Sequence, residues 1–308
     1  SNIIAVCIMP FSKATATKEQ SKIYFQIKKK LLEKNIPSQF IHRNKIFEEN
    51  FHFSLPNIAI AMLAKFGGIP WKLATPHFNQ LTIGFNIFRD ENNENTYLGS
   101  AVFFDNEGVI REVNGFNKGD ISNVCNLLIE SIKKYKESNI QEKVNKVILH
   151  FYKNIEKKEL NQIEKVIKDN LSKDSTFAII EINDTKSSVE LCFDLNYESY
   201  MPQSGTYIKL KPTEYLLFNN LRYWEMPINP INQEELPVKI RIYDPYESFN
   251  HHELISQVYE FSRMYWKSLK QKAQPVTTIY SKLIANYLSE FNGHLPDTEI
   301  SKRRVWFI

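Results

Sequence analysis

The stretch SLPNIAIAMLAKFGGIPW, residues 54–71, holds the strongest signal in the sequence. Residues 57–66 are rich in Ala and Ile and predict a buried helix, and Gly67 and Gly68 follow it as glycines often follow helix ends. Lys65 interrupts this apolar run, and a buried ammonium group is costly unless it meets an anion. The stretch therefore predicts a buried helix whose single cation faces an anionic group.

Upstream of this helix the chain alternates between strand and helix patterns. An apolar run predicts a strand over 3–9, spaced apolar residues predict a helix over 21–34, and a short strand is expected over 38–42. The chain opens on Ser1 without a methionine and enters its first strand at once, which favours a trimmed chain or a piece of a longer one. Prolines at 70 and 76 place the first domain boundary near residue 75.

Downstream, three strand-like runs separated by turn residues predict an antiparallel meander over 81–88, 97–104 and 109–113. Two helix–strand units and then further strands and helices are expected over 121–135, 147–152, 160–171, 177–182, 206–210, 215–219, 238–243, 254–265 and 277–288. Three strands followed by alternating units is the order of an RNase H-like sheet, although other α/β folds share it. The predicted fold class is α/β, a mixed sheet flanked by helices.

Composition limits the class of protein. The 308 residues are 43% apolar and 24% charged with a net charge of +4, which excludes wholesale disorder and a polycation and suggests about two domains. Cys7, Cys125 and Cys192 are scattered, which argues against a disulfide framework or zinc knuckle and for a reducing compartment. No apolar run approaches the roughly 18 residues of a membrane span, so a cytoplasmic protein without membrane contact is expected.

Residues 54–71 resemble the junction between the MID and PIWI domains of Argonaute proteins. Later segments resemble successive PIWI segments in the same order, namely 205–206, 211–215, 237–244, 275 and 280–283. The resemblance covers essentially the whole chain and is closest to a short prokaryotic Argonaute. It implies that 1–75 is the C-terminal part of a Rossmann-like MID domain and that 76–308 is an RNase H-like PIWI domain. The early part of MID and any PAZ module are missing.

Argonautes hold the 5′ phosphate of a guide strand with a Tyr, a Lys, a Gln and a second Lys. The resemblance places these roles on Tyr24, Lys28, Gln39 and Lys65, and the spacing of four puts Tyr24 and Lys28 on one helix face. Ammonium groups suit a phosphate dianion, and an amide and a hydroxyl can donate to its remaining oxygens. Two alternatives stay open: a solvated face for Lys28, which lies in a run of three lysines, and a core position for Tyr24.

The resemblance also assigns roles to the C-terminal part of the chain. It implies that the carboxylate of Ile308 helps to hold a divalent ion, Mg²⁺ or Mn²⁺, beside the guide phosphate. It places Lys267 against the guide backbone, although a lysine in solvent at a helix end is an alternative. Plain packing is the alternative for the apolar tail. Asn286 departs from the family, because many members carry an arginine there.

Slicing Argonautes need carboxylates that hold two divalent ions. The resemblance puts Asn86, Tyr152 and Lys282 at three of the four ligand positions, and residues 118–120 match the mobile glutamate position too loosely to decide. Neutral groups and a cation cannot replace these carboxylates, so we predict no slicing and no intrinsic enzyme activity. The alternative is an active PIWI-type endonuclease that uses displaced carboxylates, with Asp90, Asp105 and Glu107 as candidates, although turn chemistry explains the last two.

The resemblance implies a protein that anchors a guide RNA or DNA and pairs it with a complementary target strand. A separate effector, on a partner protein or on a missing N-terminal region, would then act on recognition. A third hypothesis is a scaffold that has lost guide binding. His251 and His252 start a predicted helix without partner ligands at metal spacing, which favours a solvated pair.

Overall fold

The computed structural model of the protein describes residues 3–12, 15–90, 93–118, 121–138, 144–152, 157–170, 175–183, 192–197, 200–219, 237–269 and 272–308. Its elements are, in chain order, β1 (Ala5–Met9), α1 (Lys18–Glu33), β2 (Ser38–His42), α2 (Arg43–Ile46), the 3₁₀ helix η1 (Glu49–Ser54), α3 (Leu55–Lys65), β3 (Gln80–Asp90), β4 (Asn93–Phe104), β5 (Ile110–Lys118), α4 (Ile121–Ser138), β6 (Lys146–Tyr152), α5 (Lys157–Asn170), β7 (Thr176–Asn183), β8 (Tyr207–Lys211), β9 (Glu214–Leu217), β10 (Val238–Tyr243), α6 (His251–Phe261), α7 (Val276–Glu290) and α8 (Glu299–Arg303).

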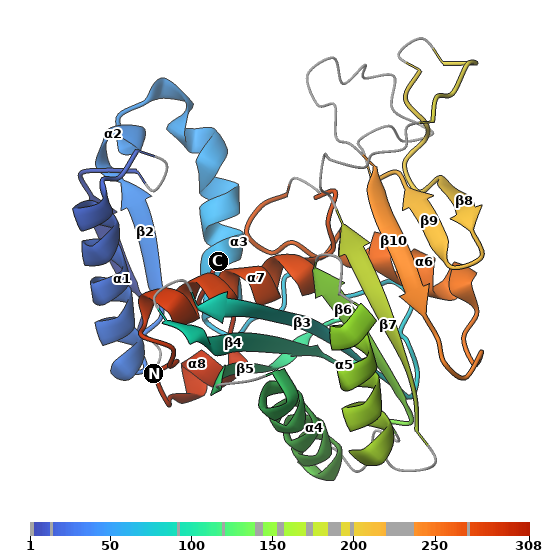
Figure 1. Ribbon diagram of the computed structural model, residues 1–308. Coiled ribbons are helices and arrows are strands. Elements are labelled where there is room, and N and C mark those ends of the chain that lie inside the picture. Colours follow the sequence, from blue (N-terminus) through green and yellow to red (C-terminus); the bar gives the residue numbers. More distant parts are fainter. Residues whose placement is uncertain are drawn as a thin grey trace.

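The strands form two sheets (Figure 1). β1 and β2 pair in parallel as a small sheet beside α1. The other eight strands form one sheet in the order β5-β4-β3-β6-β7-β10-β9-β8. Within it β3, β6 and β7 run parallel to one another, while the other pairs described are antiparallel. The prediction of an α/β chain with a mixed sheet flanked by helices is confirmed.

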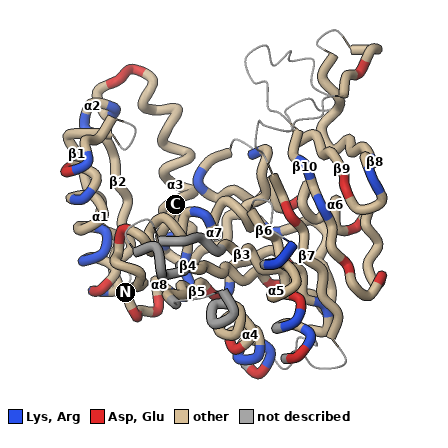
Figure 2. The backbone as a smooth tube through the Cα atoms, in the orientation of Figure 1, with Lys and Arg blue, Asp and Glu red and all other residues tan. Residues whose placement is uncertain are grey.

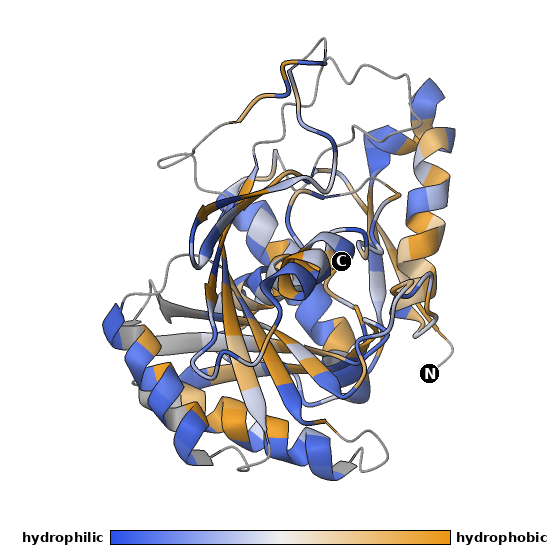
Figure 3. Cartoon of the chain, turned by 90° about the vertical axis from the view of Figure 1, so that its right-hand side faces the viewer, coloured by the Kyte–Doolittle hydropathy of each residue, from blue (hydrophilic) through white to orange (hydrophobic). Residues whose placement is uncertain are grey.

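The two faces of the large sheet are covered by different helices. Alternate residues of β3, such as Ile83 and Phe85, pack in one buried cluster with apolar residues of α4 and α5. Both helices show their hydrophobic stripe toward the strands in Figure 3. The intervening residues of β3 face α7, which crosses the sheet on the opposite side (Figure 1).

Gly84 of β3 permits the close approach of α7. A Cβ atom at this position would lie 2.0 Å from the backbone oxygen of Thr277, in the first turn of the helix. The obstacle is backbone rather than a flexible side chain, so any larger residue would push the helix away from the sheet. A glycine in a strand often marks such an approach of another backbone segment.

One apolar cluster joins α1 and α3 to the large sheet. It contains Leu32 of α1 and Ala64 of α3 together with residues of α7 and the buried C-terminal residues Trp306 and Phe307. The end of the chain therefore packs against its beginning, as Figure 1 shows with the C-terminus beside α7 and α3. Leu32 and Ala64 are thus packed among residues more than 200 positions further along the chain.

Short elements and element ends differ from the sequence-based expectations. α1 begins at Lys18 rather than 21, because Thr17 and Gln20 form a reciprocal capping box. Residues 43–54, which show no clear period, form α2 and η1, and α8 was not expected at all. Residue 75 lies in the segment between α3 and β3 that has neither helix nor strand, so the two-domain division remains a prediction. In the described parts of the chain, no helix is both long and apolar enough to cross a membrane.

Candidate functional site

A cavity of about 300 Å³ lies where α1, β2, the end of α3, α7 and the C-terminus meet. All six residues to which the sequence assigned a binding role line it: Tyr24, Lys28, Gln39, Lys65, Lys267 and Ile308. No Asp or Glu side chain is among the described residues that line the cavity. Figure 2 shows acidic and basic residues intermixed on α4 and α5, whereas the cavity is lined by Lys28, Lys65 and Lys267.

Lys65 is held inside the cavity wall. It ends α3, its side chain is buried with 2% exposed, and its Nζ donates a hydrogen bond of 2.7 Å to Oε1 of Gln39 on β2. Burial lowers the pKa of Lys65 to about 7, and the nearby charge of Lys267 acts in the same direction. The cavity therefore holds a lysine whose pKa lies near neutral pH.

Lys28 is also buried, with 1% exposed, although it lies in a run of three lysines. Its Nζ lies 5.1–5.8 Å from the centres of four aromatic rings, those of Tyr24, Phe40, Tyr287 and Trp306. Aromatic faces attract a cation at such distances. The alternative of a solvated position is therefore wrong for Lys28, whereas Lys30 in the same run is exposed.

Two phenols line the cavity beside Lys28. The hydroxyls of Tyr24 and Tyr287 share a hydrogen bond of 3.0 Å, and burial raises the pKa of both groups. Both phenols are therefore neutral hydrogen-bonding groups at physiological pH. The ring of Tyr24 also packs on that of Phe40, with 4.5 Å between their centres.

Sequence reasoning missed Tyr287 and Phe40 as parts of this site. Asn286, the α7 position at which the sequence departs from the family, is exposed and does not line the cavity, whereas Tyr287 and Leu283 do. Their spacing of four is a helical signal that could have pointed to them. Which face of α7 meets the cavity depends on how the helix packs, and the sequence does not reveal that.

Ile308 lines this cavity, and no Asp or Glu side chain of the described residues does. Val305, Trp306, Phe307 and Ile308 are all buried, and Nε1 of Trp306 donates to the backbone oxygen of Ser301. The apolar tail is therefore packed in the protein while Ile308 lines the cavity. One carboxylate among several cations cannot hold a divalent ion alone, so the donor set fits such an ion only if an anionic ligand supplies further oxygens.

The three positions expected in place of carboxylates lie together at a second location, on the face of the large sheet beneath α7. Phe85 of β3 pairs with Phe151 of β6, so the next residues, Asn86 and Tyr152, are neighbours in register. Nζ of Lys282 donates to the hydroxyl of Tyr152 at 3.0 Å and lies 4.3 Å from the ring centre. At the positions where slicing Argonautes carry metal ligands, this chain thus has an amide, a phenol and an ammonium group close together. Gly119 and Asp120, the tentative glutamate position, lie outside the described residues.

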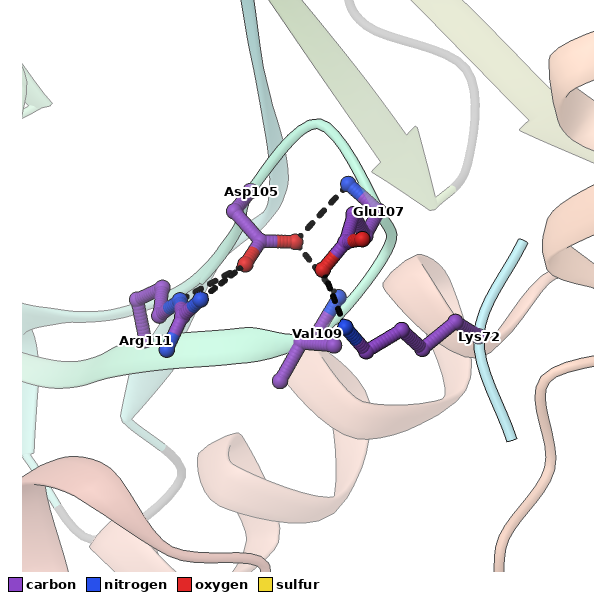
Figure 4. A network of polar contacts seen from close by, with 5 residues as sticks. All are labelled: Lys72, Asp105, Glu107, Val109 and Arg111. Atoms are coloured by element: carbon purple, nitrogen blue, oxygen red, sulfur yellow. Dashed lines mark hydrogen bonds and ion pairs between the residues drawn. The ribbon is translucent and has the colours of Figure 1, made fainter. Parts of the chain in front are cut away.

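The candidate displaced carboxylates are engaged elsewhere (Figure 4). Asp105 is buried, accepts hydrogen bonds from the backbone of Glu107 and Val109, and forms an ion pair with Arg111. Glu107 pairs with Lys72. The side chain of Asp90 lies outside the described residues.

The position of Asp105 also separates it from the Asn86 site. Asn86 pairs with Ser100 in β4, and Asp105 lies five residues further along the chain, about 17 Å away in an extended strand. Elsewhere, His251 contacts Tyr215 and His252 contacts Tyr207. The described residues contain no group of three potential metal ligands.

The Piwi domain family matches residues 14–292 of this chain. The chain belongs to the Piwi domain family. Its RNase H-like PIWI fold agrees with the resemblance to Argonautes seen in the sequence. A relative described as a Piwi protein, from the archaeon Archaeoglobus fulgidus, is 27% identical over 294 residues, which cover 88% of this chain and 67% of the relative.

Solved structures show the same fold at low identity. Drosophila Piwi superposes with a TM-score of 0.72 at 14% identity over 98% of this chain and 42% of that one. Clostridium butyricum Argonaute, solved with a guide DNA and a 19-mer target DNA, gives a TM-score of 0.72 at 20% identity over 99% of this chain and 39% of that one. This Piwi family chain therefore spans about two fifths of the length of these solved proteins.

We expect the burial of Lys65 to lower the free energy of unfolding of the protein. An unfolded lysine keeps its proton up to about pH 10.5, whereas folded Lys65 keeps it only up to about 7. Lys65→Met should therefore raise the melting temperature by about 2–4 °C near pH 6, where the penalty is complete. The gain should shrink toward about pH 10, as the penalty disappears. Thermal melts at both pH values, with Lys30→Met as the exposed control, test this; an equal gain at both, or a lower melting temperature near pH 6, contradicts it.

Proposed function

We propose that this chain binds the 5′ phosphate of a guide strand in the cavity and pairs the guide with a complementary target strand without cutting it. The observation that carries the proposal is the gathering of Lys28, Lys65 and Lys267 around one cavity that no Asp or Glu side chain lines among the described residues. Two of these lysines are buried. Such an arrangement costs stability in the free protein, and an anion bound in the cavity offsets that cost.

The chemistry of the cavity suits a terminal phosphate. A terminal phosphate carries nearly two negative charges at pH 7, and ammonium groups provide strong charge-assisted hydrogen bonds. Gln39 fixes the position of Lys65, and the phenol of Tyr24 adds a neutral donor beside Lys28. Phosphate would raise the pKa of Lys65 again, so binding would be coupled to the uptake of a proton near neutral pH.

A divalent ion, Mg²⁺ or Mn²⁺, fits the proposal once the phosphate is bound. The carboxylate of Ile308 and the phosphate oxygens would then supply the hard oxygen ligands that such an ion prefers. The ion would screen the two anionic groups from each other. Lys267 at the same cavity would hold the next guide phosphates.

The absence of cutting rests on Asn86, Tyr152 and Lys282. A neutral amide, a phenol and a cation replace the charged oxygen ligands that two divalent ions need. The alternative of an endonuclease with displaced carboxylates is disfavoured by Asp105, which is buried in an ion pair and a turn.

The proposal extends to the division of the chain and to its partners. Residues 1–75 would be the C-terminal part of a MID domain and 76–308 the PIWI domain, in a cytoplasmic prokaryotic protein. Clostridium butyricum Argonaute was solved with a guide DNA and a target DNA, and in this chain both strands could be RNA or DNA. A separate effector, on a partner protein or on a preceding region, would respond to target recognition.

Binding of phosphorylated and unphosphorylated guides tests the cavity. The protein should bind a 5′-phosphorylated strand more tightly than the same strand with a 5′ hydroxyl, and Lys65→Ala should abolish most of the preference. The salt slope of guide binding is the slope of the logarithm of the binding constant against the logarithm of the salt concentration. Lys28→Ala and Lys65→Ala should each reduce the magnitude of this salt slope by about one unit. Lys30→Ala, on the same helix but exposed, is the control and should keep the parent slope. Equal affinity for both guides removes the proposal.

Incubation of the guide-loaded protein with a complementary target and Mn²⁺ tests the absence of cutting. We expect intact target after prolonged incubation, because the ligand set cannot hold two divalent ions. Cleavage that disappears in Asp105→Asn or Glu107→Gln would establish the endonuclease instead. These two variants keep the shape of the side chains while they remove the charge and replace one acceptor oxygen with an NH2 group.

A further inference from the structure

Lys282 is placed differently from the other lysines that the sequence assigned to sites. Its side chain is exposed, and among the described residues its ammonium group has no carboxylate partner. Among the described residues it contacts Tyr152, whose hydroxyl accepts a hydrogen bond from it and whose ring face lies against it. One of its three ammonium donors is therefore used by Tyr152, and the side chain as a whole is exposed.

The surroundings fix the backbone of the α7 turn that carries Lys282. Ser100 of β4 donates a hydrogen bond to the backbone oxygen of Ser281, the residue before Lys282. Nearer the start of the helix, Thr277 bonds His150 of β6 and lies against Gly84 of β3. Three neighbouring strands thus fix the turn of α7 that carries Lys282 above Asn86 and Tyr152.

We propose that Lys282 binds a backbone phosphate of the target strand, in place of the metal ions that hold this strand in a cutting enzyme. The inference rests on the proposed function, since an RNase H-type centre faces the strand that it would cut, which is the target. A metal-free cation there contributes positive charge without activating a water molecule. The site would therefore hold a target phosphodiester and leave it intact.

The α7 helix connects this site with the cavity. Tyr287 lines the cavity, and Lys282 lies five residues earlier, about 7.5 Å along the axis and about 140° around it. The two residues consequently point to different sides of one rigid element. One side would serve the guide end and the other the target backbone.

The experiment measures target binding by the guide-loaded protein over a range of salt concentrations. Lys282→Gln should lower the salt slope of target binding by about one unit and weaken binding about fivefold near 0.1 M salt, while guide affinity stays unchanged. Lys282→Arg should keep the parent slope because it keeps the charge. Lys209→Gln is the control, since Lys209 is an exposed lysine on the distant edge strand β8.

A scan with uncharged linkages locates the phosphate. Targets that each carry one methylphosphonate linkage should show one position at which the parent loses about fivefold in affinity and Lys282→Gln loses nothing further. A bracing role for Lys282 predicts instead that Lys282→Gln and Tyr152→Phe both lower the melting temperature and leave the target slope unchanged. That result overturns the inference.

The failures of the two proposals are distinguishable. If the parent shows no preference for a 5′ phosphate and no pairing with target, the proposed function fails and this inference fails with it. If guide and target binding are intact but Lys282→Gln keeps the parent slope, only the role of Lys282 is wrong.

Discussion

Burial of Lys28 and Lys65 at a cavity that no Asp or Glu side chain of the described residues lines constrains much of this structure. Lys28 and Lys65 come from different helices and reach one cavity, where Lys65 loses most of its affinity for a proton. Desolvation of an ammonium group is expensive, and a fold selected for stability alone would avoid it. Four aromatic rings around Lys28 and the amide of Gln39 at Lys65 hold these groups in place.

The C-terminal tail and α7 make this arrangement possible. Trp306 supplies one of the rings around Lys28 and packs in the cluster that joins α1 and α3 to the large sheet. α7 is fixed on the large sheet by Gly84 and contributes Tyr287 to the cavity. The cavity is therefore a product of the whole chain, built from residues near both ends, and it depends on the packing of α7. The same helix carries Lys282, so the two proposed nucleic-acid contacts share one support.

Sequence reasoning predicted the residues that depend on local pattern and chemistry. The helical spacing of Tyr24 and Lys28 and the unusual charge of Lys65 were readable without a structure, and all of them line the cavity. The alternation of strands and helices likewise predicted the mixed sheet, because the spacing of apolar residues distinguishes a helix from a strand in long segments.

Features that depend on packing between distant elements could not be predicted from the sequence. The run of three lysines gave no sign that Lys28 alone is buried, since its burial follows from the docking of the C-terminal tail. Tyr287 was missed because the face of α7 that meets the cavity is set by the contact at Gly84. The contact of Lys282 with Tyr152 needed the register of β6 and the position of α7 together.

A crystal structure of the protein with a 5′-phosphorylated oligonucleotide is the most direct test of the central claim. The account predicts the terminal phosphate inside the cavity, with its oxygens about 3 Å from Nζ of Lys28 and Lys65 and near the carboxylate of Ile308. A well-ordered oligonucleotide whose phosphate lies elsewhere, with the cavity filled only by water, would contradict it.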